Sequence, residues 1–423
     1  MRLTHLSLEN YRGFKKLVLD FDPRLTVLVG SNGSGKSSVL DAVAMTVRDL
    51  LGRLDPLTSG NPLDAKDEIS IGAEWMRTAL SVTNGTGVAT YSASVHRDGK
   101  PAGHRLYDAT QDWLFSADFV AIYETSVRAF QEWATPSFQV APDDIGLEGS
   151  LSPGPNSLRR FSDWFRQAED LENESRVRKA DLGLRLPVLE GLREGLKLLL
   201  GADQIEFRRD LNELVIRRRG SDLNLHQLSD GERGMLLLVG DIARRLALRV
   251  GSANPAQLRV AGGTSLVEAM SNPLLTEAVV LIDELDSHLH PAWQRTVIHR
   301  LLKIFPNCQF IVATHSPQVL STVPREASIV LLGDFQPQVL PPAEGRDSNS
   351  ILNAVFGLPE RPEDMVKELR DVARLIDDDK YEEAKARIAA MEKVLTSQDP
   401  DVVHYRSLID FMERGRAADQ EGH

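Results

Sequence analysis

One eight-residue segment, residues 30–37, limits the possible folds of this chain more than any other part of the sequence. It reads Gly-Ser-Asn-Gly-Ser-Gly-Lys-Ser and matches the phosphate-binding pattern G-x-x-x-x-G-K-[ST]. An apolar, β-branched run (25–29) precedes it, and helical spacing follows it from Ser38. Glycines let backbone N–H groups surround phosphates, and a helix N-terminus adds a favourable dipole. The sequence therefore predicts an α/β fold that binds a nucleoside triphosphate.

Two residues of this phosphate loop (residues 30–37) have specific expected roles with ATP and Mg²⁺. We expect Lys36 to contact the β- and γ-phosphate oxygens and to assist catalysis, and the Ser37 hydroxyl to bind Mg²⁺. The remaining predicted nucleotide contacts are Gly30, Ser31, Asn32, Gly33, Ser34, Gly35 and Ser38. The alternative is a glycine-rich turn that carries Lys-Ser by chance, which the flanking strand and helix disfavour.

A second apolar strand, expected at 278–282, ends in the adjacent carboxylates Asp283 and Glu284. A strand that ends in Asp-Glu is common at any strand-to-loop junction. Downstream of a phosphate loop, the same pattern predicts that Asp283 holds Mg²⁺ and that Glu284 polarises the attacking water. We therefore expect ATP hydrolysis, either as turnover or as a slow switch.

Two further segments are candidates for binding phosphate. Ser229, Gly231 and Glu232 precede a long apolar helical run, so they are predicted at a helix N-terminus that can bind an anion. A plain capping box between Ser229 and Glu232 is the alternative, and the two uses are compatible. His315 ends another expected strand, 309–313, and is predicted to contact the γ-phosphate; a polar cap is the alternative.

The composition is that of an ordinary folded chain: 423 residues, 42% hydrophobic and 26% charged, with a net charge of −12. The acidic balance argues against a surface that coats nucleic acid, and leaves a local basic groove or a basic partner open. No apolar run approaches the ~18 residues of a membrane helix. We therefore expect no membrane partner. Residues 1–8 alternate like a strand, so we expect no signal peptide. A single cysteine excludes an internal disulfide, which fits a cytoplasmic location. The single cysteine, Cys308, is expected to be a buried structural thiol.

Patterning along the chain predicts the following elements. Between 69 and 102, short alternating segments broken by Asn84-Gly85 and Asp98-Gly99 indicate an antiparallel sheet. Strands are expected at 118–123, from 204 to 216, at 278–282 and at 309–313; helices at 158–179, 187–200, 231–250, 293–304 and through 349–415. Strand, helix and strand over 278–313 form a βαβ unit, which implies parallel pairing. Residues 50–62, 132–158 and 251–276 are expected to be loops or linkers.

The order of these motifs resembles the ABC-type ATPases related to RecF, SMC and overcoming-lysogenization-defect (OLD) proteins. Residues 10–14 are similar to the N-terminal segment of that group, which implies that Asn10 and Arg12 approach the nucleotide. Residues 161–166, 169–174 and 240–245, and the tail from 350, resemble the ATPase subunit of Septu-type anti-phage systems and related retron-associated ATPases.

This resemblance implies an α/β fold: an ABC-type P-loop ATPase head with a mixed sheet, an antiparallel β subdomain, a helical insertion and a C-terminal helical module. The expected division is 1–135 for an N-terminal lobe, 136–203 for a linker and helical insertion, 204–345 for a C-terminal lobe and 346–423 for the helical module. It further implies ATP held between two copies of the chain, a homodimer or higher homo-oligomer. The implied partner is an HNH-type nuclease, with contact to nucleic acid through the complex.

The sequence departs from the wider group in three ways. His290 stands where transporter cassettes carry an interface Asp, and with His288 it is interpreted as part of an interface loop rather than a metal site. The Toprim nuclease of OLD proteins has no counterpart after Gly333. A Q-loop glutamine is not identifiable, Gln111 and Gln131 being weak candidates.

The main alternative function is a RecF- or SMC-like repair or maintenance ATPase that binds DNA itself. Its discriminator is a basic groove, and the conspicuous clusters are Arg208-Arg209 and residues 217–219. Beside predicted strands such clusters more often mark a solvated sheet face. A transporter cassette is a weaker third interpretation, because nothing suggests membrane coupling.

Overall fold

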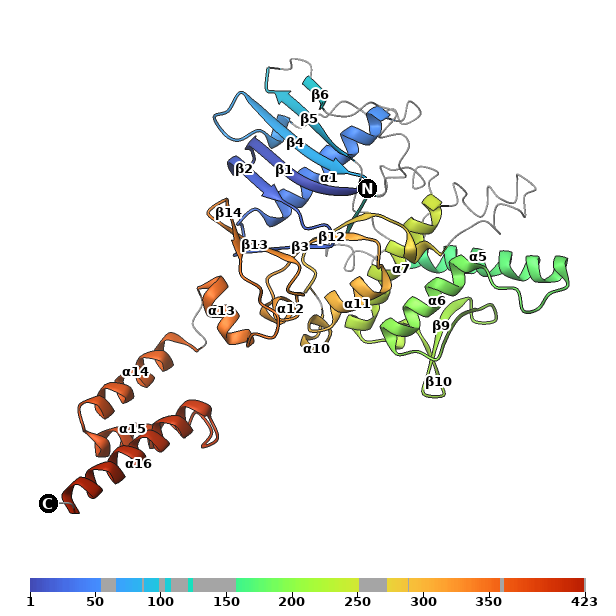
Figure 1. Ribbon diagram of the computed structural model, residues 1–423. Helices are drawn as coiled ribbons and strands as arrows, with labels where there is room; N and C mark the ends of the chain where they lie inside the picture. Colours follow the sequence, from blue (N-terminus) through green and yellow to red (C-terminus); the bar gives the residue numbers. More distant parts are fainter. Residues whose placement is uncertain are drawn as a thin grey trace. The chain divides into compact units, whose positions relative to one another are not determined.

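The computed structural model describes residues 1–54, 66–85, 87–98, 103–107, 121–124, 157–250, 272–287, 289–357 and 361–421 (Figure 1). They form two compact units, Met1–Ser348 and Asn349–His423. The finer four-part division given above stays a prediction. Among the described helices, none is long and apolar enough to cross a membrane.

A six-stranded mixed sheet lies at the centre of the first unit, in the order β14-β13-β3-β12-β11-β7. β13, β3, β12, β11 and β7 are parallel, and β14 pairs antiparallel at one edge. The strand bounds are β3 Leu25–Val29, β7 Ala121–Glu124, β11 Val279–Ile282, β12 Gln309–Ala313, β13 Ser328–Gly333 and β14 Gln336–Leu340. Every residue of β3, β11 and β12 is buried, as expected where a parallel sheet is covered on both faces. The predicted parallel βαβ unit is confirmed.

An antiparallel sheet of five strands, β2-β1-β4-β5-β6, forms a second layer. Its strands are β1 Arg2–Tyr11, β2 Phe14–Asp20, β4 Trp75–Thr83, β5 Val88–His96 and β6 Gly103–Tyr107. Helix α1 (Lys36–Leu54) lies between the two sheets, because one apolar cluster joins Leu6 and Leu80 of this sheet, Val39 and Val43 of α1, and Ile311 of β12. A short 3₁₀ helix, η1 (Lys66–Glu68), precedes β4. The antiparallel subdomain predicted from the turn signals is confirmed; Gly99 lies outside the described residues.

Helices and a small sheet form another part of the first unit (green to yellow in Figure 1). Their bounds are α5 Ser157–Lys179, α6 Pro187–Leu200, β8 Gln204–Arg208, β9 Glu213–Arg218, β10 Ser221–Asn224, η3 Leu225–Gln227, α7 Asp230–Val250 and η4 Pro273–Leu275. A buried ion cluster ties α5 to α6: the Arg193 guanidinium donates to Glu169 at 3.0 Å and to Glu172 at 3.2 Å. Within α7, buried Asp241 accepts hydrogen bonds from Arg244 and Arg245.

The prediction of a single helix at 293–304 is wrong, because the structure has two short helices there. Helix α10 (Pro291–Gln294) ends before Thr296, and α11 (Val297–Ile304) begins after it. Thr296 has φ −123° and its hydroxyl donates to the Trp293 carbonyl at 3.2 Å, so the side chain competes with the helical backbone. Helix α12 (Pro317–Leu320) follows β12.

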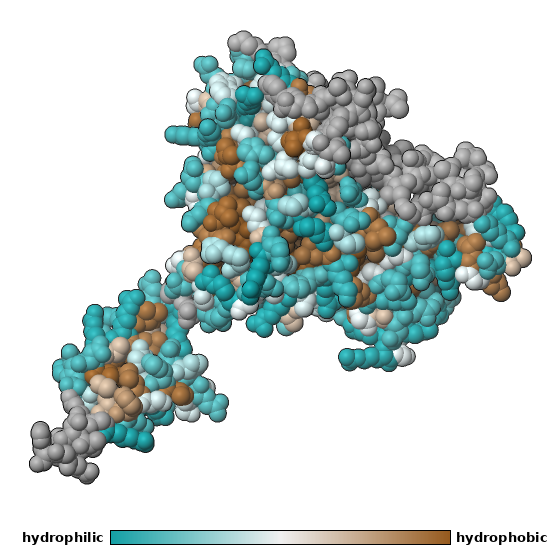
Figure 2. Space-filling view, viewed as in Figure 1, coloured by the Kyte–Doolittle hydropathy of each residue, from teal (hydrophilic) through white to brown (hydrophobic). Residues whose placement is uncertain are grey.

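The second unit is helical, as predicted, with α13 Ser348–Phe356, α14 Glu363–Asp377, α15 Tyr381–Met391 and α16 Pro400–Glu421. Helices α14, α15 and α16 share their own apolar cluster, which includes Val372, Ile388 and Ile409. Apolar residues also show on the surface of this unit (brown in Figure 2), and Phe411 is 73% exposed. The unit thus has a small core and an uncovered apolar side chain.

Candidate functional site

Three loops that are far apart in the sequence follow adjacent strands of the mixed sheet. β3 leads into the phosphate loop, β12 into the histidine loop (residues 314–317), and β11 into the carboxylate loop (residues 283–290). Because β3, β12 and β11 are parallel neighbours, all three loops emerge at the same edge of the sheet. Ligands of open α/β sheets bind at this carboxyl edge.

The phosphate loop is shaped by its own lysine and by close packing at glycine. The Lys36 Nζ donates to the carbonyls of Gly30 (3.0 Å) and Ser31 (2.9 Å), and the side chain is buried. Gly35 has φ +97°, and a Cβ there would lie 2.5 Å from Phe14 Cζ, so only glycine fits. Ser37 is exposed beside Lys36, and Ser38 is half-buried. The predicted contacts of this loop toward the nucleotide remain untested by the structure.

The charged side chains of the site shift the pKa values of Lys36 and Asp283. Burial lowers the pKa of Lys36, while attraction by Asp283, Asp286 and Glu284 acts in the opposite direction. Burial raises the pKa of Asp283, and a hydrogen bond from Ser37 opposes that rise. The Ser37 hydroxyl and the Asp283 carboxylate are therefore neighbours, and both are the hard oxygen ligands that Mg²⁺ prefers. Their placement fits the predicted metal site.

Glu284 lies in the left-handed region of the backbone, with φ +50°, and its side chain is exposed. This conformation costs a non-glycine residue roughly 1–2 kcal/mol. The neighbouring backbone is fixed by hydrogen bonds from Leu285 N to the Ala313 carbonyl (3.0 Å) and from Ser287 N to the Glu284 carbonyl (2.9 Å). Strain of this kind persists only where the surroundings enforce it, and it is concentrated at functional sites.

Asp286 joins the carboxylate loop to the histidine loop, a role that our sequence reasoning missed. Its carboxylate accepts hydrogen bonds from the Thr314 hydroxyl and from the His315 backbone N–H. Burial lowers the pKa of His315, and the positive charge of Lys36 lowers it further, against the attraction of Asp286. The structure thus places Lys36, Asp283, Glu284 and His315 within electrostatic reach of one another. The available signal was the third carboxylate in Asp-Glu-Leu-Asp after a buried strand.

Asn10 lies near the end of β1 and Arg12 in the turn before β2, both with positive φ (54° and 48°). The Arg12 guanidinium donates to Asp41 (2.7 Å) and Ser38 (3.3 Å) at the start of α1, and also pairs with Glu68. The hydrogen bond to Glu68 raises the pKa of Arg12 further above its usual range, so the guanidinium is always charged. Arg12 is therefore beside the predicted nucleotide-contact residue Ser38, and its contact with nucleotide stays a prediction.

The signature segment (residues 228–232) lies at the N-terminus of α7. Ser229 and Glu232 form a reciprocal capping box: Ser229 N and Oγ donate to Glu232 Oε2 (3.0 and 2.9 Å), and Glu232 N donates to Ser229 Oγ (3.3 Å). Burial raises the pKa of Glu232, but hydrogen bonds from Arg218 and Ser229 outweigh it and the pKa is lowered. Among the described residues, no hydrogen bond or ion pair joins Ser229 or Glu232 to the phosphate loop.

Several other sequence-based expectations can be placed. His290 caps the N-terminus of α10, its Nδ1 accepting from Ala292 N at 3.2 Å, whereas His288, Gln111 and Gln131 lie outside the described residues. No group of three or more His, Cys, Asp or Glu side chains suited to a metal ion occurs in the part of the chain that the structure describes. Cys308 is buried, which raises its pKa to about 12, as expected for a structural thiol.

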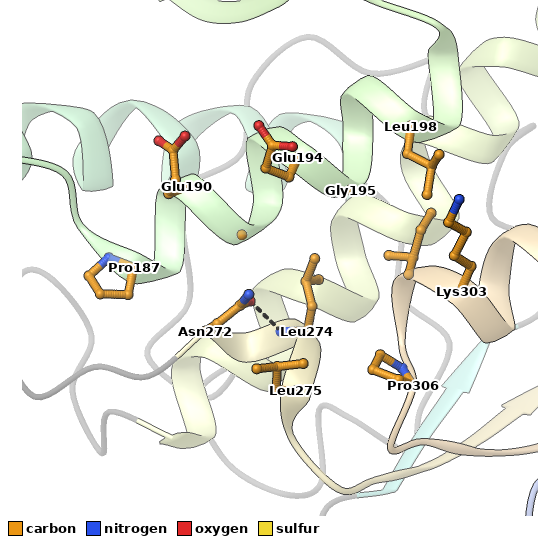
Figure 3. Close-up of a pocket in the computed structure, with 12 residues that line it drawn as sticks. Pro187, Glu190, Glu194, Gly195, Leu198, Asn272, Leu274, Leu275, Lys303 and Pro306 are labelled. Atoms are coloured by element: carbon orange, nitrogen blue, oxygen red, sulfur yellow. Dashed lines mark hydrogen bonds between the residues drawn. The ribbon is translucent and has the colours of Figure 1, made fainter.

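A cavity of about 600 Å³ lies away from these loops (Figure 3). Helix α6 forms one side of it with Glu190 and Glu194, and Leu275 and Pro306 lie on the other side. The full lining is Pro187, Glu190, Gly191, Glu194, Gly195, Leu198, Asn272, Leu274, Leu275, Lys303, Ile304 and Pro306. Because no residue of the three loops is among them, this cavity is separate from the candidate nucleotide site.

Comparisons with known proteins agree on the family of this chain. A family model described as "AAA domain, putative AbiEii toxin, Type IV TA system" matches residues 25–321. The chain is 27% identical to the Retron Ec83 probable ATPase of Escherichia coli, covering 92% of this chain and 82% of that protein. It is 25% identical to the Retron Vc95 probable ATPase of Vibrio cholerae serotype O1 biovar El Tor (86% and 80% covered). It is 20% identical to the Septu protein PtuA of Bacillus thuringiensis (94% and 95% covered).

Proposed function

Because this chain belongs to the AAA-domain family and is an ATPase, we propose that it serves an anti-phage defence system of the retron or Septu kind, in which ATP-dependent dimerisation controls a partner HNH nuclease. The observation that best supports ATP hydrolysis in this proposal is the meeting of Lys36, Asp283, Glu284 and His315 at one edge of the sheet. That set contains a cation for the phosphates, a base for water and a histidine. The similarity to retron and Septu ATPases supports the defence role.

In the proposed mechanism each side chain has one task. Lys36 and the backbone N–H groups of the phosphate loop bind and orient the β- and γ-phosphates. Glu284 accepts a proton from the attacking water, and His315 contacts the γ-phosphate oxygens. Ser37 and Asp283 would hold Mg²⁺, which supplies positive charge to the phosphate oxygens when bound.

The proposed dimer is based on the signature segment. Ser229 and Gly231 are at a helix N-terminus, where backbone N–H groups and the dipole favour an anion. Since the described contacts of Ser229 and Glu232 do not reach the phosphate loop, we propose that this N-terminus completes the nucleotide site of a second copy. The resulting dimer would be the state that acts on the nuclease.

A mixing experiment tests the dimer. Lys36→Ala and Ser229→Arg are expected to abolish ATP turnover separately, and a 1:1 mixture should recover about a quarter of the wild-type rate, because half of the dimers then hold one intact site of two. No recovery in the mixture, with both variants folded and turnover lost in each, would show that the site is completed within one chain.

The partner is tested separately, by co-expression with a candidate HNH protein encoded beside this chain. We expect the two proteins to purify together, and we expect nucleotide to change the nuclease activity. A nuclease that neither co-purifies with this chain nor responds to ATP would contradict the proposed control.

A further inference from the structure

Helix α10, only four residues long, contacts three segments that are not contiguous in sequence. Its last residue, Gln294, hydrogen-bonds to both the carboxylate loop and the histidine loop. Its third residue, Trp293, lies against the signature segment: a Cβ built on Gly231 would be 3.5 Å from Trp293 Cδ1 and 3.7 Å from His290 N. The helix is therefore placed between the parts of the chain that are expected to contact nucleotide.

The Gln294 side chain uses both ends of its amide. The Nε2 donates to the carbonyls of Leu289 (2.9 Å) and Asp286 (3.2 Å) in the carboxylate loop. The Oε1 accepts from the Ser316 hydroxyl at 2.7 Å in the histidine loop. One side chain thus holds the two loops together, and it does so in addition to Asp286, which links the same two loops.

These bonds bear directly on the geometry of Glu284. The Glu284 backbone is held at φ +50°, a conformation that the chain leaves when nothing enforces it. The Glu284 carbonyl accepts from Ser287 N, and the next turn is held by Leu289 N donating to the Asp286 carbonyl (3.2 Å). Gln294 binds that same Asp286 carbonyl. Loss of the amide would release the segment that keeps Glu284 strained.

We propose that Gln294 is a positioning residue for ATP hydrolysis, which holds the carboxylate loop and the histidine loop in register and so aims Glu284 and His315 at the same phosphate. The inference rests on the roles proposed above for Glu284 and His315. The hydrogen bonds of the Gln294 side chain go to the carboxylate loop and the histidine loop, so it acts through these two loops. Misplacing a catalytic group by about 1 Å can cost on the order of 100-fold in rate.

The test is a comparison of three variants of the full chain. Gln294→Ala removes both hydrogen-bonding ends, and Gln294→Glu keeps the shape and the acceptor for Ser316 but removes the two donors. Gln318→Ala is the matched control, because Gln318 Oε1 also accepts from Ser316 (3.2 Å) but belongs to α12. Steady-state ATP turnover, the dissociation constant of a non-hydrolysable ATP analogue and thermal unfolding are measured for each.

We expect both Gln294 variants to lower kcat about 10- to 100-fold while the analogue's dissociation constant stays within about twofold of wild type. Gln318→Ala should keep most of the wild-type kcat. The proposal is overturned if Gln294→Ala turns over like Gln318→Ala, or if its loss of rate is matched by equal losses of nucleotide affinity and thermal stability, as a purely structural role requires. Glu284→Gln, assayed in the same series, separates the two proposals: wild-type turnover there would refute the role of Glu284 whatever Gln294 does.

Discussion

Replacing Glu284 by Gln removes the proposed catalytic base. The amide has the same length and shape, and the neighbouring hydrogen bonds use the backbone, so the left-handed conformation keeps its support. Because the side chain is exposed, we expect the free energy of unfolding to change by no more than about 0.5 kcal/mol. A chemical effect can therefore be separated from a folding effect.

The expected loss of rate follows from what a general base contributes. Such a base accelerates a reaction by about 10²- to 10⁴-fold, so kcat should fall by that factor, equivalent to about 2.7–5.4 kcal/mol of barrier. Nucleotide affinity should stay the same or rise, because one negative charge near Lys36 disappears. ATP would then remain bound, and the proposed dimer should live longer.

Phosphate release, binding of a fluorescent ATP analogue and light scattering with ATP measure these three effects. Glu326→Gln is the matched control. Glu326 is an exposed glutamate just before β13, so it lies where the parallel strands begin, away from the carboxyl ends that carry the site. A kcat within tenfold of wild type would refute the assignment of Glu284 as the base. Light scattering that shows no increase in mass with ATP, in wild type or variant, would refute nucleotide-driven dimerisation.

Three other predictions concern separate parts of the chain. Asp241→Asn removes a buried carboxylate that pairs with Arg244 and Arg245, so unfolding by urea should show a loss of about 3–5 kcal/mol. His315 should titrate below its ordinary 6.5 in the nucleotide-free protein, because burial and Lys36 disfavour the protonated ring; Lys36→Ala should move the NMR midpoint upward, and an unchanged midpoint would contradict this. Removing residues 349–423, which form a unit with its own core, should spare nucleotide binding but weaken assembly or nuclease capture; an unchanged oligomer mass together with unchanged nuclease co-purification would reject that role.

Local patterns in the sequence were enough to predict the elements that carry the site. Three short apolar runs, β3 and the strands before Asp283 and His315, are rich in β-branched residues, which favours strands. The segment after the phosphate loop has helical spacing, which favours a helix. The convergence of the Asp283 and His315 loops also follows, because the parallel strands of the predicted βαβ unit place their carboxyl ends on one edge. The pairing of β3 with β12, which adds the phosphate loop, was not predicted. Strand β13, which pairs with β3, was not predicted from the sequence. Its residues, Ser328–Gly333, form an apolar run as clear as the others but carry no motif.

The side chains that hold the loops together could not be predicted in the same way. Asp286 and Gln294 act across 22 to 29 residues of sequence, and their partners are backbone groups or small hydroxyls with no recognisable spacing. The break at Thr296 has the same origin, since a helix with good apolar periodicity is interrupted by one local hydrogen bond. Propensity and periodicity describe single elements, whereas these contacts depend on which elements become neighbours.

Contacts between elements also decide how the arginine clusters are interpreted. The alternative DNA-binding function depended on these clusters. In the sequence, Arg208-Arg209 and residues 217–219 stand out as positive charge. In the structure Arg208 and Arg217 pair with Asp222, Arg209 pairs with Asp170, and Arg218 pairs with Glu232 of the signature segment. Binding to nucleic acid needs cationic side chains that neutralise phosphates and so release the counterions condensed on the nucleic acid, and carboxylates already compensate these four guanidinium groups. Together with a net charge of −12, this pairing favours a surface that recognises protein over one that binds DNA directly.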